Sequence, residues 1–181
     1  MDFETEAIVK GSPIPPKPVG IALKVRDKPG KYYAWGHPTK NNSTLREAMD
    51  ETQNLCWSSE NTVFHNAKFD IAVMKHHFDM EPHGFIDDTM ILAFLVNPHS
   101  KTLKLKELSE FYLDRPPIEQ DDLRDWILAN VKRSTEKNWG EFICLAPGDL
   151  VGRYAVADVD MTAALYKKLH KVLEEDHEKF A

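Results

Sequence analysis

The chain is poor in cysteine, with only Cys56 and Cys144 among 181 residues. The two lie far apart without metal-ligand spacing, so they predict a reduced intracellular compartment rather than a disulfide framework. No apolar run approaches the length of a membrane span, and the N-terminus lacks the basic-then-apolar pattern of a signal peptide. We therefore expect a cytoplasmic protein with no membrane contact.

The chain also lacks an excess of positive charge, since its formal net charge is −6. This argues against a broad basic surface that grips nucleic acid, although bound metal ions could still meet a phosphate chain locally. Internal repeats and low-complexity tracts are absent as well. With 42% hydrophobic and 29% charged residues, the composition is that of a globular protein, and residues 1–181 are expected to form a single domain.

The apolar pattern predicts an α/β fold, with hairpin strands first and strand–helix alternation later, giving a central mixed β-sheet flanked by α-helices. Strands are expected at the start of the chain and at residues 19–25, 31–35, 62–65 and 85–87. Helices are expected at 44–57, 66–78, 89–96, 103–113, 119–131 and from about 148 past 173. Thr44 and Glu47 form a capping-box pattern, and Asn66 and Asp88 are the expected caps of the helices that follow them.

The first strand carries two acids on one face. In an extended strand Asp2 and Glu4 point the same way, while Phe3 points into the opposite layer. A pair of like charges is costly without a cation, although a solvated edge strand would also tolerate the pair. The first strand has almost no sequence before Asp2, so it is either very short or preceded by missing residues.

The last helix places an acid on its buried face. Its apolar residues recur at steps of three and four, and Asp158 lies in the middle of that stripe with Tyr154 one turn before it. A buried carboxylate must be protonated, paired or bound to metal, so a buried salt bridge and a hydrogen-bonded core aspartate remain alternatives. Asp70 follows Asn66 by one turn in another helix, where a role at the helix dipole is an equal alternative.

Convergence of Asp2, Glu4, Asp70 and Asp158 would be strongly repulsive, by about 4 kcal/mol for each close pair at an effective dielectric near 20. Hard divalent cations with oxygen ligands remove that repulsion, and Mg²⁺ or Mn²⁺ suits an all-carboxylate set. The sequence therefore predicts two divalent metal ions, the usual apparatus for in-line attack on a phosphodiester.

Three segments resemble, in order and spacing, the motifs of the DnaQ-like 3′–5′ exonucleases: Asp2-x-Glu4, Asn66-Ala67-Lys68-Phe69-Asp70 and Tyr154-x-x-x-Asp158. The tyrosine is typical of the DEDDy subgroup. The stretch from Tyr154 to Thr162 and the triplet Asp88-Thr89-Met90 are similar to the proofreading domain of family A DNA polymerases of bacteria and phages.

The resemblance implies a ribonuclease H-like fold and two-metal hydrolysis of the 3′-terminal phosphodiester, releasing nucleoside 5′-monophosphates from single-stranded or frayed DNA. It implies that Asp2, Glu4 and Asp158 hold one ion, with Asp2 bridging to a second ion that Asp70 holds through water. Tyr154 would orient the attacking water and Glu4 would accept its proton. The implied partners are a single-stranded DNA 3′ end and a polymerase domain or subunit, in a bacterial or phage-infected cell.

The same resemblance places Thr5, Ile8 and Asn66 near the substrate. A ribonuclease D-like RNA exonuclease uses the same acids and tyrosine, and remains the nearest alternative. A non-catalytic nucleic-acid-binding domain would be expected to have lost at least one acid, and all four are present. Other candidate residues are expected to be structural: His65 at a strand end, a solvated lysine cluster at a helix start, and two tryptophans in packing. These lysines and tryptophans are Lys101, Lys104, Lys106, Trp126 and Trp139.

Overall fold

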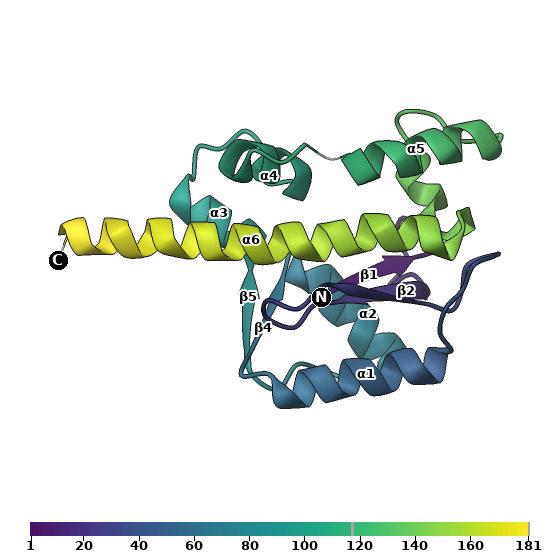
Figure 1. The fold of residues 1–181 in the computed structure, drawn as a ribbon, viewed down its shortest axis with the longest axis horizontal. Helices are drawn as coiled ribbons and strands as arrows, with labels where there is room; N and C mark the ends of the chain where they lie inside the picture. The colour runs from purple at the N-terminus through teal and green to yellow at the C-terminus, as the bar shows by residue number, and fades with distance from the viewer. Residues whose placement is uncertain (117, 181) are drawn as a thin grey trace.

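The computed structural model describes residues 1–116 and 118–180, and it has the predicted mixed α/β architecture (Figure 1). Strands β1 (Asp2–Thr5), β2 (Pro18–Leu23) and β3 (Lys31–Ala34) form an antiparallel sheet in that order, whereas β4 (Asn61–Phe64) and β5 (Phe85–Asp88) pair in parallel. The backbone nitrogen of Met1 donates to the carbonyl oxygen of Val63 at 3.1 Å. The start of β1 therefore lies against β4 and joins the two groups of strands.

The helices begin and end close to the predicted positions. They are α1 (Leu45–Ser58), α2 (Ala67–Phe78), α3 (Thr89–Val96), α4 (Leu105–Leu113), α5 (Ile118–Asn130) and α6 (Gly148–Phe180). The capping box before α1 is confirmed, because the Glu47 amide donates to Thr44 Oγ1 at 3.2 Å and the Thr44 amide donates to Glu47 Oε2 at 2.7 Å. None of the helices among the described residues is both long and apolar enough to cross a membrane.

Two cores cover the two faces of the antiparallel sheet. Phe3 and Ile21 pack on one face against Val73 and Met74 of α2, together with residues of α1. On the other face, Ala22, Tyr32 and Ala34 pack against Val151, Ala155 and Val159 of α6. Figure 1 shows α1 below β1 and β2 and the long α6 crossing above them. Because strand side chains alternate, this division sends Phe3 to the α1–α2 face and leaves the α6 face for its neighbours Asp2 and Glu4.

The segment between α4 and α6 has a weak apolar pattern in the sequence. It contains α5 and the 3-10 helix η1 (Trp139–Leu145). Leu123 and Ile127 of α5 are fully buried against the start of α6. Trp126 and Trp139 are partly buried in the same core, in agreement with a packing role.

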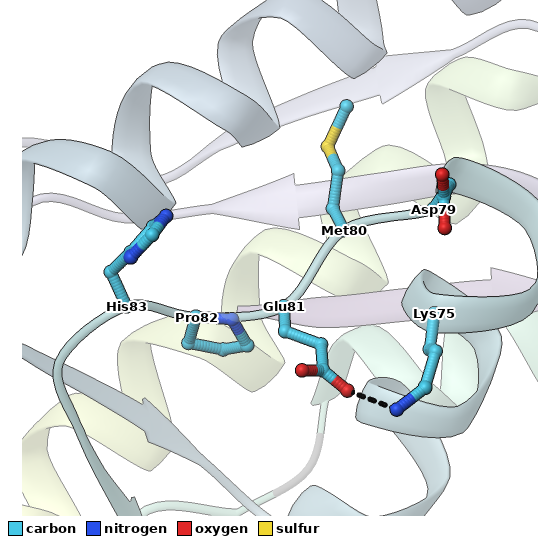
Figure 2. A pocket seen from close by; sticks show the side chains of 6 residues that line it. All are labelled: Lys75, Asp79, Met80, Glu81, Pro82 and His83. Atoms are coloured by element: carbon cyan, nitrogen blue, oxygen red, sulfur yellow. Dashed lines mark hydrogen bonds and ion pairs between the residues drawn. The ribbon is translucent and has the colours of Figure 1, made fainter.

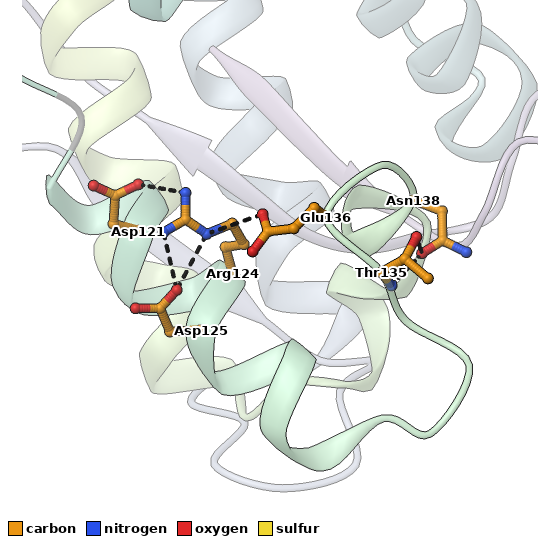
Figure 3. A network of polar contacts seen from close by, with 6 residues as sticks. All are labelled: Asp121, Arg124, Asp125, Thr135, Glu136 and Asn138. Atoms are coloured by element: carbon orange, nitrogen blue, oxygen red, sulfur yellow. Dashed lines mark hydrogen bonds and ion pairs between the residues drawn. The ribbon is translucent and has the colours of Figure 1, made fainter.

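A polar network on the outer side of α5 is shown in Figure 3. Arg124 contacts Asp121 and Asp125 at 3.0 Å each, and Glu136 of the following loop at 3.7 Å. In the same loop the Thr135 amide donates to Asn138 Oδ1 at 2.6 Å. These contacts tie the loop before η1 to α5.

Candidate nuclease site

The two acids of β1 lie on the face of the sheet that α6 covers. Asp2 is paired in register with Ala22 and Glu4 with Gly20, so both side chains project on the side of the α6 core. Glu4 is buried and Asp2 is half-buried, which excludes the solvated edge strand as an explanation of the pair. Burial raises the pKa of both carboxyl groups, and the neighbouring charge of Asp2 raises that of Glu4 further.

Asp70 approaches the same strand from α2. Its side chain is 1% exposed, and its Oδ1 accepts a hydrogen bond of 2.8 Å from the backbone amide of Phe3. Burial is the main cause that raises its pKa well above the ordinary value, and the charge of Asp2 adds to this effect. The helix-dipole alternative alone does not explain such burial, because an acid serving only the dipole would gain nothing from losing its water.

The turn before α2 is held by Asp88 rather than by Asn66, which corrects the predicted cap. Asn66 adopts the left-handed conformation and its side chain makes no capping hydrogen bond. Instead, the backbone amides of Asn66 and Ala67 donate to the two carboxylate oxygens of Asp88, at 2.9 Å each. Asp88 also caps α3 as predicted, by accepting from the Met90 amide at 2.9 Å. A charged acceptor at two helix N-termini explains why a neutral side chain is not needed there.

The third motif lies on the buried face of α6, as its periodicity predicts. Val151, Ala155, Leu165 and Leu169 are fully buried along this stripe, and Asp158 is only 7% exposed among them. Tyr154, one turn earlier, is half-buried, and loss of water around it together with the charges of Glu4 and Asp2 raises the pKa of its hydroxyl above the ordinary value. The phenol therefore stays protonated at neutral pH and can donate a hydrogen bond.

Lys106 in the first turn of α4 completes the cluster. Its ammonium group forms an ion pair with Asp158 Oδ1 and lies 4.5 Å from the centroid of the Tyr154 ring. Burial lowers the pKa of Lys106 to about 8, although the charges of Asp2 and Glu4 oppose this shift. The expectation of a solvated lysine is wrong for Lys106, whose side chain is 16% exposed. Its burial follows from the packing of α4 against α6, in which Ser109, three residues later, is fully buried.

The remaining predicted residues differ in their exposure. Thr5 is half-buried and its hydroxyl donates to the Glu6 carbonyl, whereas Ile8 is 68% exposed and Asn66 is exposed. His65 is held by a 2.8 Å contact between Nδ1 and Thr89 Oγ1, and burial lowers its pKa, as suits a structural residue.

Elsewhere on the surface, a hollow of about 400 Å³ follows the end of α2 (Figure 2). It is lined by Lys75, Asp79, Met80, Glu81, Pro82 and His83. None of the predicted site residues is among them, so this hollow is separate from the acidic cluster.

The donor set of the cluster consists of oxygen atoms: three buried or half-buried acids with raised pKa values, and Asp158 paired with a lysine. Such a set fits hard divalent cations, which would relieve the cost of charging the acids. Among the side chains that the structure describes, those of residues 1–116 and 118–175, no three His, Cys, Asp or Glu have the spacing of a metal cluster. Lys106 contributes a positive charge beside these acids through its ion pair with Asp158.

A family model described as 3′–5′ exonuclease matches residues 16–174 of the chain. The chain therefore belongs to this exonuclease family, as the three motifs predict. The matched region includes Asp70, Tyr154 and Asp158 and begins after the strand that carries Asp2 and Glu4. Members of the family depend on divalent metal ions.

Solved structures with a similar ribonuclease H-like fold include Brucella melitensis NrnC, at 20% identity and a TM-score of 0.61, covering 97% of this chain and 73% of that one. A structure described as the apo form of the nuclease has 21% identity and a TM-score of 0.58, covering 89% and 67%. NrnC bound to pGG has 20% identity and a TM-score of 0.57, with the same coverage. No curated protein matches the chain by sequence.

Proposed function

We propose that the cluster of Asp2, Glu4, Asp70 and Asp158 is the catalytic site of this exonuclease and that it hydrolyses the 3′-terminal phosphodiester of single-stranded or frayed DNA. The observation that carries the proposal is that acids from both sides of the sheet are drawn to β1. Asp70 of α2 accepts from the Phe3 amide beside Asp2. On the α6 side, Lys106 pairs with Asp158, lies over Tyr154 and feels the charges of Asp2 and Glu4. The single charge of Lys106 leaves most of the acidic charge uncompensated, so binding of divalent metal ions best explains the arrangement.

Asp2, Glu4 and Asp158 would hold one Mg²⁺ or Mn²⁺, and Asp2 with Asp70 would hold a second. Two bound cations would supply activation of a water molecule and stabilisation of the leaving 3′ oxygen. The Tyr154 hydroxyl, which stays protonated because its pKa is raised, would orient that water by donating or accepting a hydrogen bond. Glu4 would accept the proton of the water through its carboxylate.

The products would be nucleoside 5′-monophosphates released one at a time, as in proofreading. The residues that follow the first motif, Thr5 and Ile8, together with Asn66, are proposed to contact the terminal nucleotide. Ile8 and Asn66 are exposed and Thr5 is half-buried, so all three are accessible enough for this contact. A polymerase domain or subunit as partner, action as the single domain 1–181 and a cytoplasmic location belong to the same proposal.

A second candidate is a 3′–5′ exonuclease that trims RNA in the manner of ribonuclease D. It is favoured by the likeness in fold to NrnC bound to pGG, a dinucleotide. The acids and the tyrosine would perform the same chemistry on either polymer, so the cluster itself does not separate the two candidates.

Matched DNA and RNA oligonucleotides of one sequence, labelled at the 5′ end, test both candidates. The assay is run with Mg²⁺, with Mn²⁺ and with EDTA. We expect a ladder of products shortened from the 3′ end of DNA, with mononucleotides released, only when a metal is present. Faster shortening of RNA would replace the DNA proposal with the second candidate. If neither polymer is shortened with either metal, the proposed catalytic function is wrong.

A further inference from the structure

Lys106 differs from the other lysines near the start of α4. Lys104 is 80% exposed and pairs with Glu107 of its own helix at 3.5 Å, as a solvated lysine does. Lys106 is 16% exposed and turns away from its own helix toward Asp158 of α6. Its ammonium group also lies over the Tyr154 ring, so both functional side chains of the third motif contact a single cation supplied by α4.

The backbone that carries Lys106 is firmly placed. Leu108 of α4 packs with Leu165 and Leu169 of α6 in a separate buried cluster, and Ser109 is fully buried beside it. The Cα atom of Lys106 therefore stays fixed. The four-carbon side chain can still move the ammonium group without unpacking α4.

We propose that Lys106 is an internal counter-cation that occupies the acidic cluster in the metal-free protein and is displaced from Asp158 when a divalent metal binds. The inference rests on the proposed metal site. The Asp158 oxygen that pairs with the ammonium group is the atom that a metal would need, and one oxygen does not serve both cations at close range because they repel each other. The single charge of Lys106 neutralises only part of the cluster, so two divalent cations would replace it.

Lys106 therefore weakens metal binding, because its ion pair with Asp158 opposes it. Each binding event must break the ion pair with Asp158 before the carboxylate is free. Removing the charge abolishes the competition and leaves the acids without a counter-charge, and both effects strengthen metal binding. The metal-free protein should become less stable at the same time, since Asp158 then lacks its partner.

The test measures Mn²⁺ binding by titration calorimetry on the full chain with wild-type, Lys106→Met, Lys106→Arg and Lys104→Met proteins, without nucleic acid. Lys104→Met is the matched control, because it removes the same charge from the same end of α4. We expect Lys106→Met to bind Mn²⁺ at least about tenfold more tightly, since a repelling charge in contact with a ligand is lost. Lys104→Met should stay within about twofold of wild type, as an exposed charge contributes little.

Lys106→Arg keeps the charge and should bind Mn²⁺ no more tightly than wild type. If it matches Lys106→Met, charge is not the cause and the inference is wrong. Equal or weaker binding by Lys106→Met compared with Lys104→Met would also overturn it. The rise in melting temperature on adding Mn²⁺ gives a second measurement, expected to be larger for Lys106→Met than for wild type.

Asp158→Asn separates the two proposals. If wild type binds no Mn²⁺, or if Asp158→Asn binds it as well as wild type, the proposed metal site itself has failed. If Asp158→Asn loses binding while Lys106→Met behaves as Lys104→Met does, the site is correct and only the role of Lys106 is wrong.

Discussion

The two sides of the acidic cluster hold their carboxylates by different means. On the α2 side, Asp70 accepts a hydrogen bond from the Phe3 backbone amide, a donor fixed in β1. On the α6 side, Asp158 is paired with the ammonium group of Lys106, at the end of a flexible side chain. A backbone donor stays in place whatever binds, whereas a lysine can leave. One half of the site is therefore fixed by the sheet backbone, and the other half is adjustable.

The largest expected effect is on catalysis and tests whether both sides are needed. Asp70→Asn and Asp158→Asn should each lower kcat/KM for Mg²⁺-dependent release of nucleotides by at least about a hundredfold, because each removes a metal ligand. Single-turnover assays on a 5′-labelled oligonucleotide measure the loss. Lys104→Met is the control with an altered charge outside the cluster, and it should keep wild-type activity. Less than about a tenfold loss in Asp158→Asn would remove this residue from the site.

Tyr154 shares the α6 side with Asp158 but is not expected to bind metal. Tyr154→Phe should lower kcat by about ten- to a hundredfold through loss of the hydroxyl that orients water. Mn²⁺ affinity measured by calorimetry should stay as in wild type. An unchanged kcat would show that the hydroxyl has no part in the reaction, and a weakened Mn²⁺ affinity would place it among the ligands.

The metal-free stability of the same two asparagine variants should change in opposite directions. Asp70→Asn should raise the free energy of unfolding by about 1 kcal/mol, because it removes a buried charge while its amide oxygen can still accept from Phe3. Asp158→Asn should lower it by about 2–4 kcal/mol, because it leaves the Lys106 ammonium group buried without a partner. Urea denaturation in EDTA measures both. If the free energy of unfolding changed with the same sign in both variants, Asp70 and Asp158 would be stabilised in the same way.

The smallest expected effect concerns pH. Burial raises the pKa values of Asp2, Glu4 and Asp70 above their ordinary values of 3.8, 4.5 and 3.8. Above about pH 4 the folded metal-free protein therefore holds more protons than the unfolded chain, and these groups make its stability fall as pH rises. Asp70→Asn should reduce this fall, measured as the difference between the two proteins in urea denaturation from about pH 5 to about pH 7. A steeper fall in the variant would contradict the raised pKa of Asp70.

Adding Mg²⁺ should act in the opposite direction. Metal binding requires ionised carboxylates, so the stabilisation by Mg²⁺ should grow as pH rises over the same range. Melting curves with and without Mg²⁺ at each pH measure this. A stabilisation that shrinks with rising pH would argue against carboxylate ligands.

Residue periodicity alone predicts which faces of the strand and the helix carry the acids. The alternation in β1 assigns Asp2 and Glu4 to one face, and the stripe of α6 identifies Asp158 as a buried acid, as the structure shows. Both are local patterns, which need no knowledge of distant contacts. The order of the three motifs then predicts the exonuclease family, and the family match confirms it.

The features that were missed depend on contacts between distant parts of the chain. Lys106 and Asp158 are far apart in sequence, and nothing in the local pattern says that α4 packs beside α6. Sequence position predicts Asn66 as the cap of α2, because a cap is usually the residue just before the helix, whereas Asp88 reaches this turn from the neighbouring strand. The 3-10 helix of residues 139–145 has no apolar period of its own and forms against the core of α5 and α6.

Asp88 is an acid close to the site whose role is structural rather than catalytic. Its carboxylate accepts from amides at the start of two helices and so fixes where the α2 backbone begins, one turn before Asp70. Loss of that carboxylate would let the turn shift and would carry Asp70 out of alignment with β1. A substitution of Asp88 could thus abolish activity by displacing Asp70, although Asp88 itself takes no part in the reaction.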